Sequence, residues 1–431
     1  MVKTVKNNDA KKIVYNVLWM IFDKVFMLIM NLLVTVQVAN HFGAMEYGSY
    51  QYAVNVVAIF EILVTFVDSR VVKSKYYHYS ANTVVFAATI SRILFSIISG
   101  IIGVCFILFF SNDMKFSAMF IILLLNTIII NVKAGMANRF EFLLMSKKIV
   151  VASDLATVIG AIMQLMAVRF DWSIIVISLI ALFTSIMNVL IVYIQYKWEF
   201  KERLICKFDR KLFKSMIRQS VPLAIAASCA TIYTRCDSVM IGMLMTTAEV
   251  GVYSISLKLI SVVQIALSPV RESVYPKLIA LYNTDKTAYQ KMYIRVSSML
   301  TWMYIIGVAF SFFILPFLFR FLNAEYAEAF PIYKIYVLGT FFMYNAALRA
   351  GHYTMINKGN ILMYTQLFSL VLNVILNYVG ISWIGVYGAA IATIITQGLS
   401  LMISNLFFGQ EGRDVFKWQI KALNPVNIFI K

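Results

Sequence analysis

The stretch Ser173–Tyr196 reads SIIVISLIALFTSIMNVLIVYIQY, which is 24 consecutive positions without Asp, Glu, Lys or Arg. A helix needs about 20 mainly apolar residues to cross the hydrocarbon core of a bilayer. Residues 296–319 form another uncharged stretch of 24, and residues 359–410 hold 52 uncharged positions, enough for two such helices. These segments predict a membrane protein built from spanning helices.

The composition of the whole chain agrees with this prediction. Of its 431 residues, 61% are hydrophobic and 13% are charged, and the mean hydropathy is +0.80. Soluble domains carry about 25% charged residues, so the composition excludes a water-soluble fold, and disordered chains are far more polar. Twelve spans would use about 240 residues, which leaves short loops and no large soluble domain.

Twelve segments satisfy the length and hydropathy of a spanning helix. The fold class is therefore predicted to be an all-α polytopic membrane protein. The predicted spans are residues 13–40, 47–68, 83–110, 116–136, 149–168, 173–196, 219–245, 250–270, 296–319, 331–356, 360–380 and 386–408.

The placement of positive charge orients these spans. Alternate connecting segments hold 30 of the 38 Lys and Arg residues, whereas the opposite loops hold three. Cytoplasmic loops are enriched in Lys and Arg, so both termini are predicted to be cytoplasmic. The net charge of +18 is thereby explained by topology, without nucleic-acid binding. The segments that carry the 30 residues are 1–12, 69–82, 133–148, 197–218, 271–295, 349–358 and 409–431.

An internal repeat divides the chain. Residues 46–50 read EYGSY and residues 249–253 read EVGVY, so an E-x-G-x-Y motif recurs after 203 positions. Each copy opens the helix that follows an outer turn, and six spans separate the copies. This predicts two pseudo-symmetric six-helix bundles related by an axis along the membrane normal. Their predicted bounds are 1–208 and 209–410, followed by a cytoplasmic tail, 411–431, that forms an interfacial helix.

Ionisable side chains inside the spans are the candidate site residues, because burying a charge in the bilayer is costly. The cations outnumber the acids, so ion pairs cannot neutralise all of them, although single residues could be structural pairs or could snorkel. The excess of positive charge suits an anionic ligand such as a phosphate or diphosphate. The predicted substrate-binding residues are Lys24, Arg92, Arg235 and Lys258, and the structural or coupling acids are Asp23 and Asp237.

The sequence contains no motif for other chemistry. It has no Walker A loop and no Gly-rich dinucleotide turn, so nucleotide hydrolysis and cofactor binding are not expected. Its three histidines are scattered, and no cysteines have zinc-ligand spacing. No enzymatic activity, cofactor or metal is therefore predicted.

Three sets of residues in the sequence are similar to motifs of a known protein family. They resemble the Wzx-type O-antigen and polysaccharide-unit flippases of the multidrug/oligosaccharidyl-lipid/polysaccharide exporter superfamily. The sequence departs from the family at Asn40-His41-Phe42-Gly43, where the family tends to have Arg-x-Leu-Gly. The sets are Asn16, Trp19 and residues 39–50; Ser220-Val-Pro222, Asp237, Gly242, residues 251–254 and Tyr275-Pro276; and residues 377–381 with 385–393.

The resemblance implies a V-shaped pair of bundles that works by alternating access, coupled to proton or sodium entry. It implies an undecaprenyl-diphosphate-linked glycan as the substrate, carried across the bacterial inner membrane for O-antigen or capsule synthesis. The implied partners are membrane lipids, a polysaccharide polymerase and a chain-length regulator, and no nucleic acid.

Two other functions remain open. A cation-coupled small-molecule exporter of the multidrug branch would share the architecture, but cationic drugs favour buried acids over buried cations. A membrane polysaccharide polymerase would need a large external loop with catalytic acids, and the predicted outer loops are short.

The topology can be tested with reporter fusions. A reporter within residues 197–218 is expected on the cytoplasmic side, because this segment holds eight Lys and Arg residues. Reporters at Glu46, Glu249 and Glu325 are expected on the outer side. An external signal from 197–218 would contradict the whole map.

Overall fold

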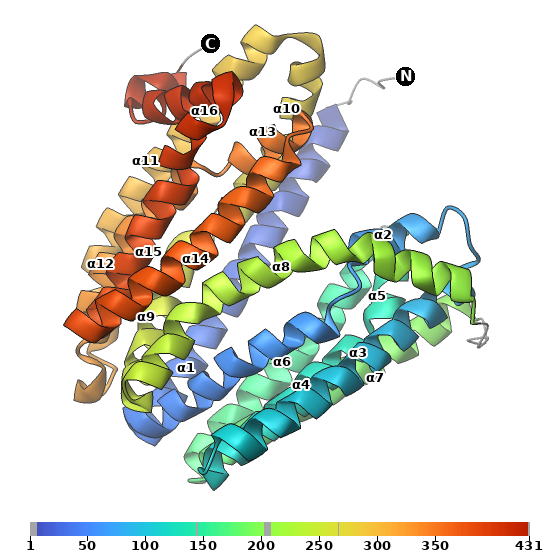
Figure 1. Ribbon diagram of the computed structural model, residues 1–431, viewed down its shortest axis with the longest axis vertical. Coiled ribbons are helices and arrows are strands. Elements are labelled where there is room, and N and C mark those ends of the chain that lie inside the picture. Colours follow the sequence, from blue (N-terminus) through green and yellow to red (C-terminus); the bar gives the residue numbers. More distant parts are fainter. Residues whose placement is uncertain (1–6, 144, 202–207, 266, 430–431) are drawn as a thin grey trace. The chain divides into compact units, whose positions relative to one another are not determined.

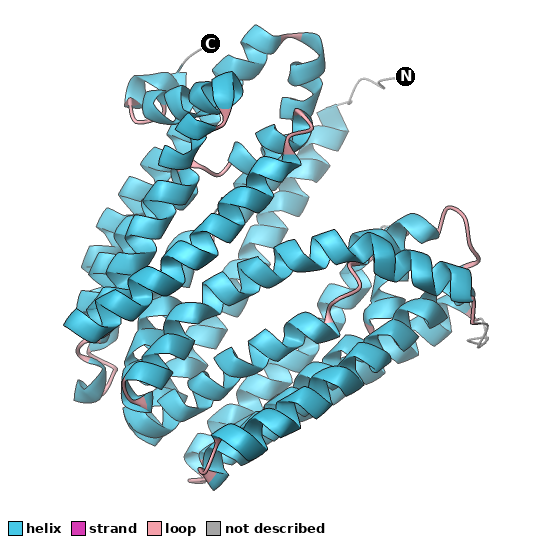
Figure 2. Cartoon of the chain, in the orientation of Figure 1, coloured by secondary structure: helices cyan, strands magenta, loops and turns pink. Residues whose placement is uncertain are grey.

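The computed structural model describes residues 7–143, 145–201, 208–265 and 267–429, with side chains from residue 26 onward. The secondary structure of these residues is helical, with short connecting loops and no strand among them (Figure 2). This confirms the all-α prediction.

The described residues form two compact units. The first contains residues 37–251, and the second contains the described residues up to Val36 together with those from Val252 onward. The predicted boundary at residue 208, which divides the sequence repeats, stays a prediction.

The unit of residues 37–251 holds the second part of α1 and the helices up to α8 (Figure 1). Within it α4 packs along α7, and α7 packs along α6. The helices are α1 (Asn7–Val64), α2 (Ser69–Lys75), α3 (Ala81–Phe110), α4 (Met114–Val132), α5 (Ala134–Phe142), α6 (Ser146–Arg169), α7 (Ile174–Phe200) and α8 (Arg210–Leu244).

The other unit holds the chain from Val252 of α9 onward, and within it α15 packs against both α14 and α12. The α-helices are α9 (Thr247–Gln264), α10 (Leu267–Thr284), α11 (Lys286–Phe319), α12 (Ala329–Asn345), α13 (Arg349–Met355), α14 (Gly359–Ile384), α15 (Val386–Leu401) and α16 (Gly409–Lys421). Three 3-10 turns connect or end them: η1 (Ala324–Tyr326), η2 (Ile403–Phe407) and η3 (Pro425–Phe429).

The twelve predicted spans fall on helical segments, although four of them, 116–136, 250–270, 331–356 and 386–408, each extend over two consecutive helical elements. The first two are the halves of α1, which are divided at Gly43, where φ is 72° and the helix is interrupted. A positive φ of this kind favours glycine because it has no Cβ. In the described part of the chain, nine helical stretches are long and apolar enough to cross a membrane. The protein is therefore a multi-pass membrane protein.

Aspartates begin three of the long helices. Asp113, Asp209 and Asp285 lie just before α4, α8 and α11, and each carboxylate accepts a hydrogen bond from a main-chain N–H of the first turn. These acceptors satisfy donors that have no partner within the helix. The charged residues between the spans thus also define the helix ends.

The tail contains the helix that the sequence predicts. One face of α16 buries Val415 and Gln419, while Glu411 lies on the solvent-exposed side. The Lys358 ammonium lies 2.9 Å from the Glu411 carboxylate, and this hydrogen bond lowers the pKa of Glu411 below its usual value. The location of α16 at a membrane surface stays a prediction.

The two copies of the E-x-G-x-Y motif meet in space. A Cβ built on Gly48 would lie 1.7 Å from the Thr247 carbonyl oxygen, and one built on Gly251 would lie 2.4 Å from the Ala44 carbonyl oxygen and 3.2 Å from the Gly48 Cα. Main chain therefore packs directly on main chain at this crossing. Small residues allow such close approach between membrane helices.

We expect Gly48→Ala to destabilise the protein by about 3 kcal/mol, because the new methyl group would overlap main-chain atoms that cannot rotate away. Gly307→Ala is the matched control, since a Cβ there meets nothing within 4 Å, and alanine stabilises a helix by about 0.5–1 kcal/mol. Thermal unfolding of both variants in detergent measures the difference. Equal melting temperatures would contradict the packing of this crossing.

Candidate functional site

Arg92 is held at the end of α1. Its guanidinium is buried and donates from Nη1 to the Val64 carbonyl and from Nη2 to the Val67 carbonyl, both at 2.9 Å. Val64 is the last residue of α1, whose C-terminal end carries a partial negative charge, and Val67 follows it in the connection to α2. Arg92 therefore has two fixed hydrogen bonds to uncharged groups.

A cavity of about 500 Å³ opens beside Arg92 within the unit of residues 37–251. Lys133, Asn131 and Asn138 also line it. Lys133 is half-buried and donates to the Asn188 side-chain oxygen over 2.6 Å. Two cations thus face one cavity while they hydrogen-bond carbonyl and amide oxygens.

Two ion pairs border the same cavity. Arg70 donates to both carboxylate oxygens of Asp68 at 2.9 and 2.8 Å, and the Lys73 ammonium lies 2.9 Å from the Glu141 carboxylate. Asp68, Arg70 and Glu141 line the cavity. Since these acids have cationic partners of their own, the charges of Arg92 and Lys133 give the cavity a positive excess.

Lys133 has a counterpart in the other half of the chain. Lys133-Ala134-Gly135 and Arg349-Ala350-Gly351 match after 216 positions. Lys133 donates to Asn188, and Arg349 donates from Nε to the Asn405 side-chain oxygen over 2.7 Å. The two asparagines are 217 positions apart. Each unit therefore contains the same pair of a cation and an amide.

The glycines of the two triplets are also tightly packed. A Cβ on Gly135 would lie 2.5 Å from the Thr89 hydroxyl, and one on Gly351 would lie 2.5 Å from the Tyr275 ring. The glycine lets the short helix that begins within each triplet, α5 or α13, pack closely on its neighbour. The contact pattern supports an internal repeat.

The two cation–amide pairs differ in what covers them. Arg349 is buried, and α16 packs on its partner, with a 2.9 Å hydrogen bond between the side chains of Asn405 and Gln419. Tyr353 also donates to Asn405 over 2.8 Å. Lys133 faces the 500 Å³ cavity instead. The first half thus keeps a space that the second half fills with protein.

Sequence reasoning assigned Lys133 and Arg349 to cytoplasmic segments and missed this site. The signal that could have found it is the pair of triplets, K-A-G and R-A-G, together with two asparagines at the same spacing. Cations at helix ends are common, so only the repeat distinguishes these two.

Arg235 lies on α8, where its side chain is exposed and donates from Nη1 to the Asn55 side-chain oxygen over 3.1 Å. Asn55 is buried on α1 and donates in turn to the Gln51 carbonyl. Arg92 and Arg235 both contact α1, but at different levels, near Val64 and at Asn55. The structure does not join these two cations in one cluster.

The remaining candidates are distributed over the chain. Asp237 is buried on α8 in the first unit, and Lys258 is half-buried on α9 in the second. Asp23 and Lys24 belong to α1, but their side chains lie outside the described residues. The predicted roles of all six residues stay predictions. No group of three His, Cys, Asp or Glu residues in the described chain could hold a metal ion.

Solved structures share this fold. An inward-facing multidrug resistance MATE family transporter of the MOP superfamily matches with a TM-score of 0.74 and 12% identity, covering 91% of this chain and 96% of its own. The lipid II flippase MurJ in an inward closed conformation matches with a TM-score of 0.72 and 15% identity. The match covers 94% of this chain and 90% of the MurJ chain.

A third match is a MOP superfamily transporter from Pyrococcus furiosus, with a TM-score of 0.58 and 12% identity, covering 91% of this chain and 95% of its own. At these identities the matches establish the fold. No curated protein matches the chain.

Comparison with protein-family models identifies the family of the chain. The family model Polysacc_synt, described as polysaccharide biosynthesis protein, matches residues 13–282, which is more than half of the chain. The predicted resemblance is therefore confirmed at the level of family and fold: the chain belongs to the family of polysaccharide biosynthesis proteins, and its fold is the one seen in MOP superfamily transporters.

Proposed function

We propose that the protein is a flippase for an undecaprenyl-diphosphate-linked oligosaccharide unit. It carries the unit across the bacterial inner membrane by alternating access, for O-antigen or capsule synthesis. Lys24, Arg92, Arg235 and Lys258 contact the diphosphate at successive positions along its path, and Asp23 and Asp237 balance or couple the charge. Both termini are cytoplasmic, and the exported unit passes to a polymerase and its chain-length regulator.

The bonding of the cations carries this proposal. Arg92 donates to two main-chain carbonyls and Arg235 to an amide. Such partners hold a guanidinium in place without cancelling its charge. A phosphate group accepts charge-assisted hydrogen bonds from guanidinium groups in a fixed geometry. Oriented cations on membrane-spanning helices are therefore suited to an anionic head group.

The family and the fold support a lipid-linked substrate. The matching family carries the description polysaccharide biosynthesis protein, and one of the structural matches is a lipid II flippase. A substrate that joins a sugar to a membrane lipid is consistent with both descriptions.

A small-molecule exporter is the second candidate, because one of the matching structures is a multidrug resistance transporter. Many exported drugs are cations, which would be repelled by Arg235 and Lys258 and attracted by a buried carboxylate. The excess of cations in the spans favours the anionic substrate.

Replacing Arg235 by Ala is expected to reduce surface polysaccharide at least about tenfold, which corresponds to about 1.4 kcal/mol of lost binding. Folding should change little, because Arg235 is exposed and its hydrogen bond to Asn55 is a single neutral-acceptor contact. Surface polysaccharide and the accumulated lipid-linked unit are measured in cells that carry the variant as their only copy. Arg169→Ala, an exposed cation on a predicted outer loop, is the control.

Arg235→Lys separates charge from geometry. We expect partial activity, because lysine restores the positive charge but not the planar fork of the guanidinium. Normal export by Arg235→Ala would contradict a role for this residue in head-group binding.

Transport is expected to depend on an ion gradient and not on ATP, because the sequence has no nucleotide-binding motif. Vesicles with purified protein and the lipid-linked unit should flip it faster when a proton or sodium gradient is imposed. Stimulation by ATP alone, without any gradient, would overturn this expectation.

A further inference from the structure

The side-chain amide of Asn55 contacts Arg235 in the one orientation that its neighbours allow. Its NH₂ group donates to the Gln51 carbonyl over 2.8 Å, and its oxygen accepts from Arg235 Nη1 over 3.1 Å. A main-chain carbonyl can only accept hydrogen bonds, and a guanidinium group can only donate them. The reversed amide would lose both contacts, so the oxygen of Asn55 is fixed toward the guanidinium.

Close packing fixes the main chain on both sides of this contact. Arg235 and Gly242 are seven residues apart on α8, almost two full turns, and therefore lie on the same face of that helix. A Cβ built on Gly242 would lie 2.4 Å from the ring of Tyr52 on α1. Tyr52 precedes Asn55 by three residues, so α1 and α8 meet at Gly242 and again at Arg235. Both contacts lie within the unit of residues 37–251.

Asn55 is an acceptor that carries no charge. It is buried, with 5% of its surface exposed, whereas Arg235 is exposed. A carboxylate at position 55 would bind the guanidinium more strongly, but it would also cancel the positive charge. The amide therefore fixes the direction of the guanidinium and leaves its charge for an anionic group.

The internal repeat has a cation at the position that corresponds to Asn55. The E-x-G-x-Y motifs recur after 203 positions, and the same offset relates Asn55 to Lys258. Each of these two residues follows the glycine of its motif, Gly48 or Gly251, by seven positions, so each lies on the glycine-bearing face of its own helix. The second repeat thus has its cation on this helix, whereas the first repeat receives one from α8.

We propose that Asn55 is a positioning residue, which holds the Arg235 guanidinium at the place where the second repeat has Lys258. Each repeat then presents one cation at an equivalent position. Asn55 acts through Arg235 and does not itself contact the substrate. The binding of an anionic head group by Arg235 rests on the proposed function. The equivalence has a consequence of its own, because a cation moved from Arg235 to position 55 should still serve the first repeat.

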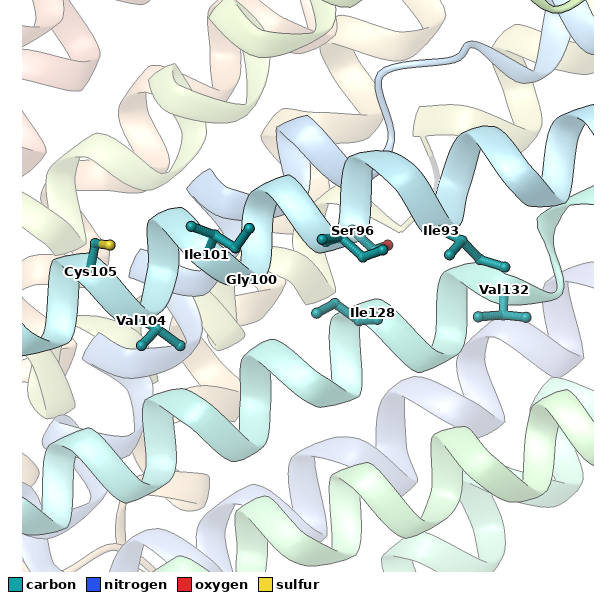
Figure 3. Close-up of a pocket in the computed structure, with 9 residues that line it drawn as sticks. Ile93, Ser96, Gly100, Ile101, Val104, Cys105, Ile128 and Val132 are labelled. Atoms are coloured by element: carbon teal, nitrogen blue, oxygen red, sulfur yellow. The ribbon is translucent and has the colours of Figure 1, made fainter.

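An apolar groove in the same unit supplies a control position. It lies between α3 and α4, has a volume of about 490 Å³ and is lined almost entirely by aliphatic side chains. Figure 3 shows Cys105 at one end of this groove. Cys105 is exposed, so a lysine there adds a positive charge on a different helix, and its long side chain can extend toward the membrane surface.

Relocation of the cation tests the assignment in cells that carry each variant as their only copy. Arg235→Ala combined with Asn55→Lys is expected to export at least about threefold more than Arg235→Ala alone, because lysine is a compact point charge that needs no acceptor at position 55. Arg235→Ala combined with Cys105→Lys has the same net charge and is expected to export like Arg235→Ala. Surface polysaccharide and the accumulated lipid-linked unit are measured, and melting temperatures of the purified proteins show whether each variant is folded.

Two single variants separate positioning from folding. Asn55→Asp keeps an acceptor for Arg235 but cancels its charge, so it is expected to reduce export about as much as Arg235→Ala does. Asn55→Leu removes the acceptor and is expected to reduce export about threefold or more in the wild type, but not further in the Arg235→Ala background, since residues that act through one contact are not additive. A merely structural role of Asn55 would reduce export in both backgrounds.

The outcomes that overturn the assignment are distinct from those that overturn the function. A further loss by Asn55→Leu in the Arg235→Ala background would show that Asn55 acts through the fold and not through Arg235. Equal export by the folded Asn55→Lys and Cys105→Lys double variants would overturn the equivalence with Lys258, and if Asn55→Lys does not fold, the Asn55→Leu comparison decides alone. Normal export by Arg235→Ala would remove the proposed role of Arg235 itself, together with the assignment of Asn55.

Discussion

The crossing of Gly48 and Gly251 is the constraint on which the rest of the structure depends. There the second part of α1 meets α9 with main chain against main chain, since neither position has room for a Cβ. A close crossing of this kind fixes the register of the two helices relative to each other. This geometry requires a glycine at the equivalent position of each sequence repeat.

The architecture could be predicted from the sequence because it follows from physical effects that act on whole segments and not on single contacts. Water excludes apolar segments such as residues 173–196, and cytoplasmic loops collect Lys and Arg. These two effects act on every residue of a segment, so twelve spans could be located without any contact being known. The E-x-G-x-Y repeat indicated the relation between the halves, but not that its two glycines touch.

The candidate site could be predicted only in part. The cost of burying a charge identified Arg92 as a residue that needs a partner, and the structure supplies one carbonyl at the end of α1 and one just after it. Which acceptor a guanidinium reaches depends on where another helix ends, to within an ångström, and no periodicity encodes this. Lys133 was assigned to a loop because its sequence environment is basic, although its ammonium turns inward to Asn188.

The tail helix α16 makes the two halves of the repeated architecture unequal. A duplicated fold starts with two equivalent places beside its cation–amide pairs. In the second half α16 covers Asn405, and Arg349 is buried in protein, while in the first half Lys133 still borders an open cavity. The two halves of a repeated chain have therefore become unequal: a small molecule can reach the cation of the first half through the cavity, whereas protein shields the cation of the second half.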